Sequence, residues 1–486
     1  MADRDHQADG GEHLSADKDA RVVENEALRA ENVELKKMVA ALEKKVADLE
    51  ARLGRNPRNS SMPPSAEGLT KPPAPNRAER RAAKRRPGKQ PGDPGHHLAQ
   101  VDDPDEIVPH RAPRCPACKG DLSDAEVIDV ERRQVFEVPR IRAHVTEHQM
   151  LKVRCHCGAE TKAPAPPEAS APACYGPGVR ALAVYLSVYQ HVPYVRLAEI
   201  FADVLNMAVS VGAIKAMVVE AGGGLGLFLD VVKDLLRDAP AVHFDETGAR
   251  VEGSLHWVHV ACTSLYTLLY CHKRRGTVAL DDGGIVEKMT GVAVHDGYAS
   301  YRTYDVVHGL CNSHHVRELQ GVIDHFDQDW AGQMIDLLLD TKEAVEAARS
   351  RGRKHLDAKT LHSIRVRYGK VVQKGWAANE EPTKAAEGKW YKNKATNLLD
   401  RLDAYRDDVL RFTTNFNVDF SNNQAERDIR MTKLQQKISG SWRTKSGADH
   451  FCAIRSYVST MKKHDYDVLA GLRQLFEGHV WLPGET

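Results

Sequence analysis

The sequence predicts a multidomain α/β protein, and three observations support this fold class. The first hundred or so residues combine a leucine heptad with a basic, Pro/Gly-rich stretch, and two close cysteine pairs follow. The C-terminal half then alternates short apolar, β-rich runs with helical periodicity, which is typical of an α/β core. At 486 residues the chain is long enough for several domains.

The overall composition excludes several classes of protein. Because 68 basic residues face 67 acidic ones, the net charge identifies no binding partner. The nine cysteines are scattered or in close pairs, unlike the framework of a secreted disulfide-rich domain. The N-terminus is polar, and no apolar run approaches the roughly 20 residues that span a bilayer. We therefore expect a soluble protein of a reducing compartment, with no membrane contact.

Residues 1–20 are predicted to be disordered, and residues 21–53 to form a leucine-zipper-like coiled coil. Leucines recur every seven residues, each preceded at a distance of three by Asn or Val: Leu28, Leu35, Leu42 and Leu49, after Asn25, Asn32, Val39 and Val46. Leu at d with Val and a buried Asn at a favours a parallel two-stranded coiled coil. The alternative is a single amphipathic helix packed on its own chain, but the stripe is narrow for a globular face.

Residues 54–100 are interpreted as a flexible basic linker. Pro, Gly and Ser oppose regular structure there, and Arg77–Lys89 holds seven basic residues against one acid. Four arginines are candidate contacts to DNA phosphates: Arg80, Arg81, Arg85 and Arg86. Such contacts would be independent of DNA sequence and sensitive to salt. The alternative is a solvated tether.

Residues 101–175 are a candidate zinc-binding module. The ligands would be two cysteine pairs, Cys115 with Cys118 and Cys155 with Cys157. Two β-rich runs, at 127–138 and 144–155, are predicted to be strands between and beside the pairs, as in a zinc ribbon with four thiolate ligands. His156 or His148 could replace one cysteine as a ligand. The alternative is four reduced cysteines without metal.

Residues 176–238 are predicted to be helical. The runs at 192–205 and 210–222 are separated by a short break, with Ser210 as the N-cap of the second run. This spacing resembles a helix-turn-helix and would suit DNA binding. An ordinary pair of packed helices is the alternative.

Residues 239–470 are predicted to form the α/β core. Strands are expected at 241–251, 255–264, 266–276, 291–299 and 306–313, and helices at 277–290 and 314–323. Helical periodicity dominates about 325–410, which we interpret as an insertion into the core. The helix within Asn422–Gly440 then returns to the core, and 471–486 form a C-terminal tail.

Three acidic residues stand out by their predicted positions in this core. Asp245 and Asp296 each close a short apolar strand, AVHF and VAVH, and Glu426 lies on the returning helix. Three carboxylates of this kind can bind divalent metal ions and drive phosphoryl transfer on nucleic acid. For either Asp, the alternative is a role in a turn or helix cap.

The helix that carries Glu426 also carries cations. Arg430 and Lys433 follow Glu426 at steps of four and three residues, so that all three share one face. Lys437 lies one turn further on. These cations are candidate contacts to a phosphate backbone beside the carboxylates.

Several sequence blocks occur in a characteristic order: LGRNPRNSSMPPS, GKQPGDPGH, CPAC, GPGVRAL, HFDETGARVEG, HDGYASY, LCNSHHVREL and NNQAERDIRMTKLQQKISGSWRT. In these blocks, over nearly its whole length, the chain resembles the DDE transposases of bacterial insertion-sequence family 66. The resemblance implies an RNase H-like catalytic core with Asp245, Asp296 and Glu426 as its metal-binding catalytic triad. It also implies Mg²⁺ or Mn²⁺ as the cofactor, beside a structural Zn²⁺ in the CPAC module.

The resemblance further implies an activity and partners. The activity is cleavage of DNA strands at the ends of an insertion sequence and strand transfer into target DNA. The partners are the element's inverted repeats, the target DNA, further copies of the chain in a homodimer or higher oligomer, and accessory proteins of the element. The implied location is the bacterial cytoplasm, in association with the nucleoid. The alternatives are a DNA-binding regulator with a degenerate core, and an RNase H-type nuclease without strand transfer.

Some residues depart from the family pattern or compete for a role. The second cysteine pair is tighter than CxxC, and Met62 stands where the linker motif commonly has Lys. Cys311 and His314 form a CxxH pattern, which could order the edge of the active site, contact the DNA end, or be a buried structural pair. Glu246 and Glu318 are rival acids. Glu246 is expected on the opposite face of the strand from Asp245, and Glu318 is expected to pair with Arg317 or a histidine.

Overall fold

The computed structural model describes residues 28–39, 98–139, 141–379 and 393–484, together with 42, 46, 50, 54, 59, 383–384 and 390–391. The chain divides into two compact units. Unit 1 comprises Met1–Ala78, Pro177–His191 and Met217–Thr486, and unit 2 comprises Glu79–Gly176 and Val192–Ala216. The described part of unit 1 has a mixed α/β fold, as the sequence predicted.

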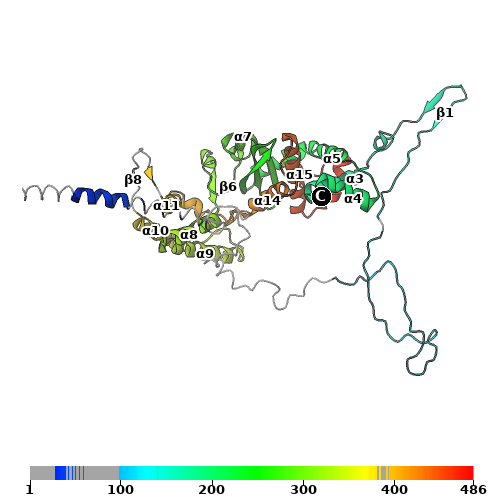
Figure 1. The fold of residues 1–486 in the computed structure, drawn as a ribbon, viewed down its shortest axis with the longest axis horizontal. Helices are drawn as coiled ribbons and strands as arrows, with labels where there is room; N and C mark the ends of the chain where they lie inside the picture. The colour runs from blue at the N-terminus through cyan, green and yellow to red at the C-terminus, as the bar shows by residue number, and fades with distance from the viewer. Residues whose placement is uncertain are drawn as a thin grey trace, which may run out of the picture. The chain divides into compact units, whose positions relative to one another are not determined.

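A five-stranded mixed sheet is the centre of unit 1 (Figure 1). Its strands are β3 (Ala241–Val251), β4 (Ser254–Cys262), β5 (Thr267–His272), β6 (Val292–His295) and β7 (Val307–Leu310), in the order β5-β4-β3-β6-β7. β3, β4 and β5 pair in antiparallel fashion, whereas β6 and β7 run parallel to β3. The antiparallel and parallel halves of the sheet therefore meet at β3.

The tight turn between β3 and β4 allows β3 to be long. Glu252 and Gly253 both have positive φ, 52° and 74°, and connect the closing pair Val251 and Ser254. Two-residue turns of this handedness match the twist of antiparallel strands. β3 has the bounds predicted for this strand, 241–251, so Asp245 lies inside it and not at its end. The strand continues to Val251 because β4 supplies a pairing partner for every residue from His243 onward.

The edge strand β5 is covered by α15 (Lys445–Lys463). Two hydroxyl groups of α15 accept hydrogen bonds from backbone N–H groups of β5: Ser456 Oγ from Leu269 at 2.8 Å and Thr460 Oγ1 from Thr267 at 3.1 Å. Unpaired N–H groups at a sheet edge invite pairing with another chain. The helix therefore satisfies these donors and closes this edge of the sheet.

The helix α14 (Asn423–Ser439) lies against β3 and β4. Its buried residues, Ala425, Ile429 and Thr432, recur at steps of four and three and so form one face toward the sheet. Charged residues at other positions of this helix include Glu426, Arg427 and Arg430. The helix that packs on the strand of Asp245 therefore also carries Glu426 and several cations.

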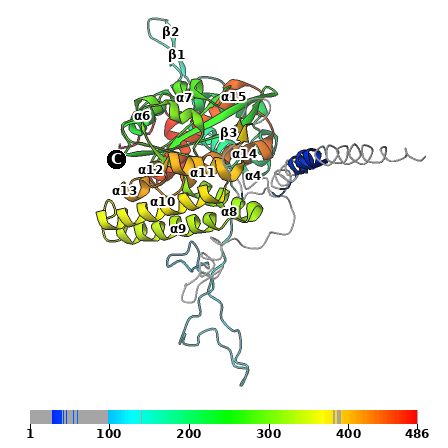
Figure 2. The same ribbon diagram turned by 90° about the vertical axis from the view of Figure 1, so that its left-hand side faces the viewer.

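Helices fill most of the stretch between β7 and α14. They are α8 (Asn312–Phe326), α9 (Asp329–Arg349), α10 (Ala358–Ala378), α11 (Lys394–Ala404), α12 (Arg406–Val409) and α13 (Arg411–Thr414). Figures 1 and 2 show α9 and α10 side by side. They pack around Trp330, Tyr368 and Leu399, all buried. A Cβ at Gly375 would lie 2.7 Å from Leu399 Cδ1, so only glycine allows this close approach.

The other helices of unit 1 flank the sheet in sequence. They are α3 (Pro177–Val184), which continues into a π-helical segment (Tyr185–Tyr189), α6 (Gly226–Arg237), α7 (Thr277–Gly283) and α16 (Val468–Phe476). α7 is shorter than the helix predicted at 277–290. It ends at Gly284, which has a left-handed φ of 67°, and a 3₁₀ turn at Val286–Lys288 follows.

In unit 2 the prediction of two long strands around the cysteine pairs was wrong. Residues 127–138 have no regular secondary structure. In the described part of unit 2 the paired strands are Lys152–Arg154 (β1) and Glu160–Lys162 (β2), with Cys155 and Cys157 in the turn between them, and Arg114 forms an isolated bridge with Asp121. β-propensity expresses itself only where a partner strand or core is present. The side chains Ile128, Val135 and Val145 are accordingly exposed.

The predicted helical pair at 192–222 is present as α4 (Tyr194–Leu205) and α5 (Val211–Gly223). α4 ends where Asn206 takes a left-handed conformation with φ of 50°. Ser210 Oγ accepts the backbone N–H of Ala213 at 3.1 Å, which is the expected N-cap contact. The two helices are thus separated by a capped break.

Near the N-terminus, residues 28–39 are helical. Their heptad side chains are about half exposed: Leu28 at 49%, Leu35 at 50% and Val39 at 52%. Among the described residues, no single helix has both the length and the apolar composition to cross a bilayer, although the bent pair α5 and α6 passes when taken together.

Candidate active site

Asp245 and Asp296 occupy equivalent positions on neighbouring parallel strands. β3 and β6 pair from Ala241 with Val292 to His243 with Val294, and two further steps in this register set Asp245 opposite Asp296. Asp296 follows the last residue of β6, and its Oδ1 accepts the backbone N–H of Tyr298 at 2.9 Å. Extending this register places the two residues opposite each other just beyond the last parallel pair.

Neighbouring acids affect the pKa of Asp245. Burial raises this pKa well above its ordinary value, and the negative charges of Glu246, Asp296 and Glu426 raise it further. The structure thus brings the three predicted acids, Asp245, Asp296 and Glu426, into one electrostatic neighbourhood. They come from a strand interior, a strand end and a helix of unit 1.

Glu426 lies in the first turn of α14 with one oxygen atom unsatisfied. Its Oε1 is buried and has no hydrogen-bond partner. Two basic nitrogens lie near it, His314 Nδ1 at 3.8 Å and Arg317 Nη2 at 3.7 Å, both beyond hydrogen-bond distance. A buried carboxylate oxygen of this kind is costly unless a cation or donor reaches it.

Asn422, just before α14, connects three parts of the site. Its Nδ2 donates to the carbonyl of Phe244 at 2.6 Å, and its Oδ1 lies 3.0 Å from Nδ1 of His243. Its backbone N–H donates to Sγ of Cys311 at 3.1 Å. Asn422 is 1% exposed. It therefore fixes the start of the Glu426 helix to the strand of Asp245, a role that the sequence did not reveal.

Asp428 is a second residue that the sequence did not reveal. Its Oδ2 accepts hydrogen bonds from Lys463 Nζ at 2.6 Å and from Thr267 Oγ1 at 2.9 Å. Lys463 also donates to the carbonyls of Thr263 and Tyr266. The Asp428 and Lys463 side chains are each 12% exposed. Through these contacts Asp428 joins α14 to β5 and α15.

Of the two rival acids, Glu246 is occupied by other partners. Its Oε1 accepts Arg275 Nε–H at 2.9 Å and its Oε2 accepts the Tyr301 hydroxyl at 3.1 Å. Burial raises the pKa of Glu246 to about 7, with the charge of Asp296 acting in the same direction and Arg275 against it. With both oxygens engaged, Glu246 is a counter-ion for Arg275, which also lies over the ring of Tyr298.

Glu318, the other rival, pairs with Arg401 Nη2 at 2.7 Å. The predicted partners were Arg317 or a histidine, and this prediction was wrong. Arg401 lies on α11, so the contact joins α8 to the helical insertion. Glu318 thus has a partner that requires no metal ion.

Cys311 and His314 lie beside Glu426. The sulfur of Cys311, a ring nitrogen of His314 and a carboxylate oxygen of Glu426 all lie within 4.8 Å of one another. Among the described residues, no other three or more His, Cys, Asp or Glu side chains gather this closely. The ligand atoms of the three acids, and those of the four cysteines of unit 2, do not all lie within 4.8 Å of one another.

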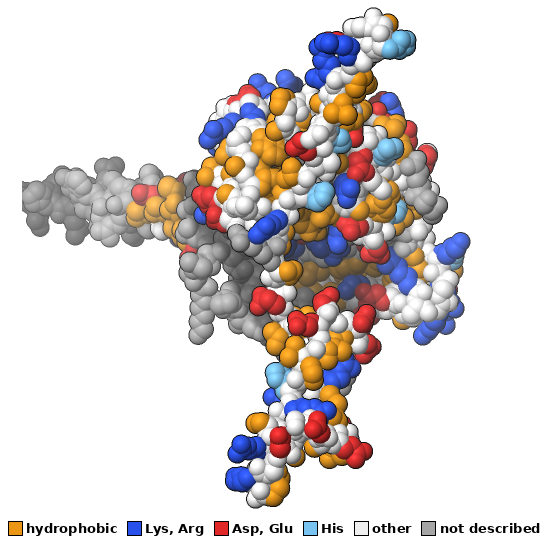
Figure 3. All heavy atoms as spheres, turned by 90° about the vertical axis from the view of Figure 1, so that its right-hand side faces the viewer, with side chains coloured by type: hydrophobic (Ala, Val, Ile, Leu, Met, Phe, Trp, Pro, Cys, Tyr) orange, Lys and Arg blue, Asp and Glu red, His pale blue; other side chains and the backbone are white. Residues whose placement is uncertain are grey.

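The predicted basic contacts differ in availability. Arg430 and Lys437 are exposed on α14, whereas Lys433 Nζ donates to the carbonyl of Gly248 at 2.5 Å and its pKa is lowered by burial. Arg80, Arg81, Arg85 and Arg86 lie outside the described residues. On the face drawn in Figure 3, the coloured Lys and Arg side chains are interspersed with Asp and Glu. Bulk surface charge therefore marks no DNA path on that face.

The four cysteines of unit 2 lie in two short turns. Cys115 N–H donates to the carbonyl of Gly120, and Cys155 N–H to that of Ala159. Hydrogen bonds from Cys118 lower the pKa of Cys115, and hydrogen bonds from Cys157 lower that of Cys155. The lowered pKa of Cys115 and of Cys155 favours the thiolate form that metal ligation requires.

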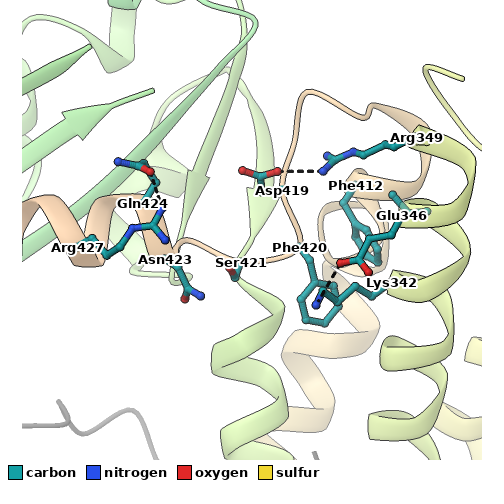
Figure 4. A pocket seen from close by; sticks show the side chains of 11 residues that line it. Lys342, Glu346, Arg349, Phe412, Asp419, Phe420, Ser421, Asn423, Gln424 and Arg427 are labelled. Carbon is teal, nitrogen blue, oxygen red and sulfur yellow. Dashed lines mark hydrogen bonds and ion pairs between the residues drawn. The ribbon is translucent and has the colours of Figure 1, made fainter. Parts of the chain in front are cut away.

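A pocket of about 240 Å³ lies beside the N-terminal turn of α14, between it and α9 (Figure 4). Its polar side chains pair with one another: Lys342 with Glu346, Arg349 with Asp419, and Arg427 with Gln424. None of the three predicted acids lines it. The acids therefore form a site separate from this pocket.

Comparison with known proteins gives two family matches. A model described as Transposase IS66 family matches residues 172–450, which is more than half of the chain and includes all three acids. A family of unknown function (DUF6444) matches residues 14–99, which include the predicted zipper and basic linker. No curated protein matches the chain. Together with the site described above, the first match shows that this chain belongs to the IS66 transposase family.

Proposed function

We propose that this chain cleaves DNA strands at the ends of an insertion sequence and transfers the freed 3′ ends into target DNA. The observation that carries the proposal is that three acids from distant parts of the chain act on one another electrostatically. Asp245 and Asp296 share a register on parallel strands, and the charge of Glu426 acts on Asp245. The mixed sheet with Asp245 on its central strand supports an RNase H-like core.

The donor chemistry of this site fits a hard divalent cation. Three carboxylates provide only oxygen donors, burial and the charges of neighbouring carboxylates raise the pKa of Asp245, and Glu426 Oε1 is buried without a hydrogen bond. Mg²⁺ and Mn²⁺ prefer such ligands. Asp245, Asp296 and Glu426 would hold the metal, which when bound supplies charge stabilisation for the attacking and leaving oxygens of phosphoryl transfer.

Other residues of the chain would position the DNA and the acids. The exposed Arg430 and Lys437 project from the helix of Glu426 and would contact phosphates. Asn422 keeps that helix on β3 through its contact with the Phe244 carbonyl. The basic linker, and α4 with α5, would add contacts to the element's inverted repeats.

The N-terminal heptad would join two copies of the chain. Leu28 and Leu35 are about half exposed in the single chain, as the seam residues of an unpaired coiled-coil helix are. A dimer would bring two catalytic units to two element ends. Accessory proteins of the element remain further proposed partners, and the bacterial nucleoid the proposed location.

The activity is tested with purified protein and DNA carrying the terminal repeats of the element that encodes it. We expect Mg²⁺-dependent cleavage at the repeat ends and joining of the 3′ ends to a target plasmid, both abolished by EDTA. Cleavage without joining would indicate a nuclease. Specific binding without cleavage in Mg²⁺ or Mn²⁺ would instead support a regulator with an inactive core.

We also propose a structural zinc ion held by Cys115, Cys118, Cys155 and Cys157. The change Cys115→Ser should lower the zinc content by about one ion per chain, because a closed four-ligand site fails without one thiolate. Elemental analysis of the purified chain measures this, with Cys174→Ser as the control at an exposed cysteine outside the pairs. An unchanged zinc content in a Cys115→Ser/Cys155→Ser variant would disprove the assignment.

A further inference from the structure

Cys311, His314 and Glu426 form a compact set of three different donors. Cys311 is the N-cap residue of α8, His314 lies in the first turn of that helix, and Glu426 comes from α14. Their sulfur, nitrogen and oxygen atoms lie within 4.8 Å of one another. A first-row metal ion with bonds of about 2.0–2.3 Å would need only a small contraction of this set.

Two of the three donors are buried without a hydrogen bond. His314 Nδ1 and Glu426 Oε1 are both in this state, and they lie 3.8 Å apart, too far for a direct bond. Buried polar atoms are nearly always satisfied, so a pair of unsatisfied atoms facing each other calls for an explanation. A cation between them would satisfy both.

The surroundings hold these donors in place. Sγ of Cys311 accepts the backbone N–H of Asn422 at 3.1 Å, the kind of outer contact that steadies a metal-bound sulfur. The N–H of Asn312 donates to the carbonyl of Phe420 at 3.0 Å, which ties α8 to the segment before α14. The two helices that supply the donors are therefore fixed to each other.

We propose that Cys311, His314 and Glu426 bind a borderline-soft divalent cation such as Zn²⁺. Thiolate and imidazole donors favour Zn²⁺ over Mg²⁺, whose preferred ligands are oxygens. Binding releases the thiol proton to solvent as the metal–sulfur bond forms. Three protein ligands leave a fourth position open, as in zinc sites that also bind water or a ligand oxygen. Arg317, near Glu426 Oε1, offsets part of the ligands' negative charge.

This site shares Glu426 with the proposed catalytic triad, but the inference that it binds a metal does not depend on the proposed catalytic function. Binding can be measured without DNA and without Mg²⁺, and two of its three ligands lie outside the triad. If both proposals hold, Zn²⁺ at this site competes with Mg²⁺ for the Glu426 carboxylate. The structure then assigns the CxxH pattern a metal-binding role.

The test is a Co²⁺ titration of the full chain, since Co²⁺ replaces Zn²⁺ and absorbs visibly when bound to thiolate. The wild type should bind about one Co²⁺ more per chain than Cys311→Ser, and its spectrum should contain a thiolate-to-cobalt absorption band that the variant lacks. The four cysteines of unit 2 are unchanged in both proteins, so the difference spectrum reports Cys311. His314→Gln should weaken binding at least about tenfold.

The matched control is Cys452→Ser, at another buried cysteine, on α15. Its Co²⁺ spectrum should equal that of the wild type. No difference between wild type and Cys311→Ser, or an equal loss in Cys452→Ser, would overturn the site. If Cys311→Ser does not fold by circular dichroism, His314→Gln decides in the same way. A Co²⁺ site in a wild-type chain that cleaves no DNA would refute the proposed function and leave this inference standing.

Discussion

Changing Asp245 or Asp296 to Asn, or Glu426 to Gln, should reduce DNA cleavage and strand transfer by at least about a hundredfold, because each amide weakens a proposed metal ligand. The substitutions keep the side-chain shape, so DNA binding should persist. Cleavage of end-containing DNA in Mg²⁺ and a gel-shift assay measure the two properties on the same protein. Double variants should be hardly slower than single ones, since residues that act as a unit are not additive.

The matched control for Glu426→Gln is Glu318→Gln. Glu318 pairs with Arg401 and is not among the acids that raise the pKa of Asp245. Its amide should cleave at close to the wild-type rate, and Glu246→Gln should also lose far less activity than a triad variant. If Glu318→Gln were inactive while Glu426→Gln still cleaved, the third acid would be assigned wrongly.

The sequence predicted the sheet of unit 1 well because its strands are both patterned and paired. The runs that became β3 to β7 are apolar and bounded by turn residues, and each finds a neighbour in the sheet. The same β-rich pattern at 127–138 produced no strand, since the described structure provides it no partner. Local pattern thus predicts a strand only where tertiary pairing completes it.

The positions of the acids were harder to predict than their identities. Asp245 was expected to close the apolar run AVHF, but it lies inside the 11-residue strand predicted at 241–251, whose length depends on the turn at Glu252 and Gly253. Its proximity to Asp296 follows from the register of β3 and β6, which no local pattern specifies. Glu426 was selected by its helix face shared with Arg430 and Lys433, and the family resemblance implies the same third acid.

The residues that hold the site together could not be predicted from the sequence. Asn422 contacts Phe244 across 178 positions of the chain, and Asp428 contacts Thr267 across 161. A short polar side chain next to a helix start looks like an ordinary cap, and an acid on a charged helix looks solvated. Only the fold shows that Asn422 is buried and that the Asp428 side chain is only 12% exposed, each in contact with a β-strand.

The ion pair between Asp428 and Lys463 leads to the largest expected effect on stability. The change Asp428→Ala should lower the free energy of unfolding by about 3–5 kcal/mol, because it leaves the Lys463 charge buried without its counter-ion. Thr267 also loses its acceptor. Chemical denaturation followed by tryptophan fluorescence measures this, since all six tryptophans lie at or after Trp257, within unit 1.

The matched control is Asp407→Ala. Asp407 also pairs with a cation, Arg365 at 2.9 Å, but the two side chains are 66% and 54% exposed, so its removal should change stability by no more than about 1 kcal/mol. Asp428→Asn keeps an acceptor for Thr267, so its loss of unfolding free energy should fall between those of Asp428→Ala and Asp407→Ala. Equal effects of Asp428→Ala and Asp407→Ala would show that burial does not strengthen the inner pair. If the effects rank in this order, the ion pair of Asp428, two residues after Glu426, holds their shared helix on the sheet. DNA cleavage by Asp428→Ala should then decline in proportion to the loss of folded protein.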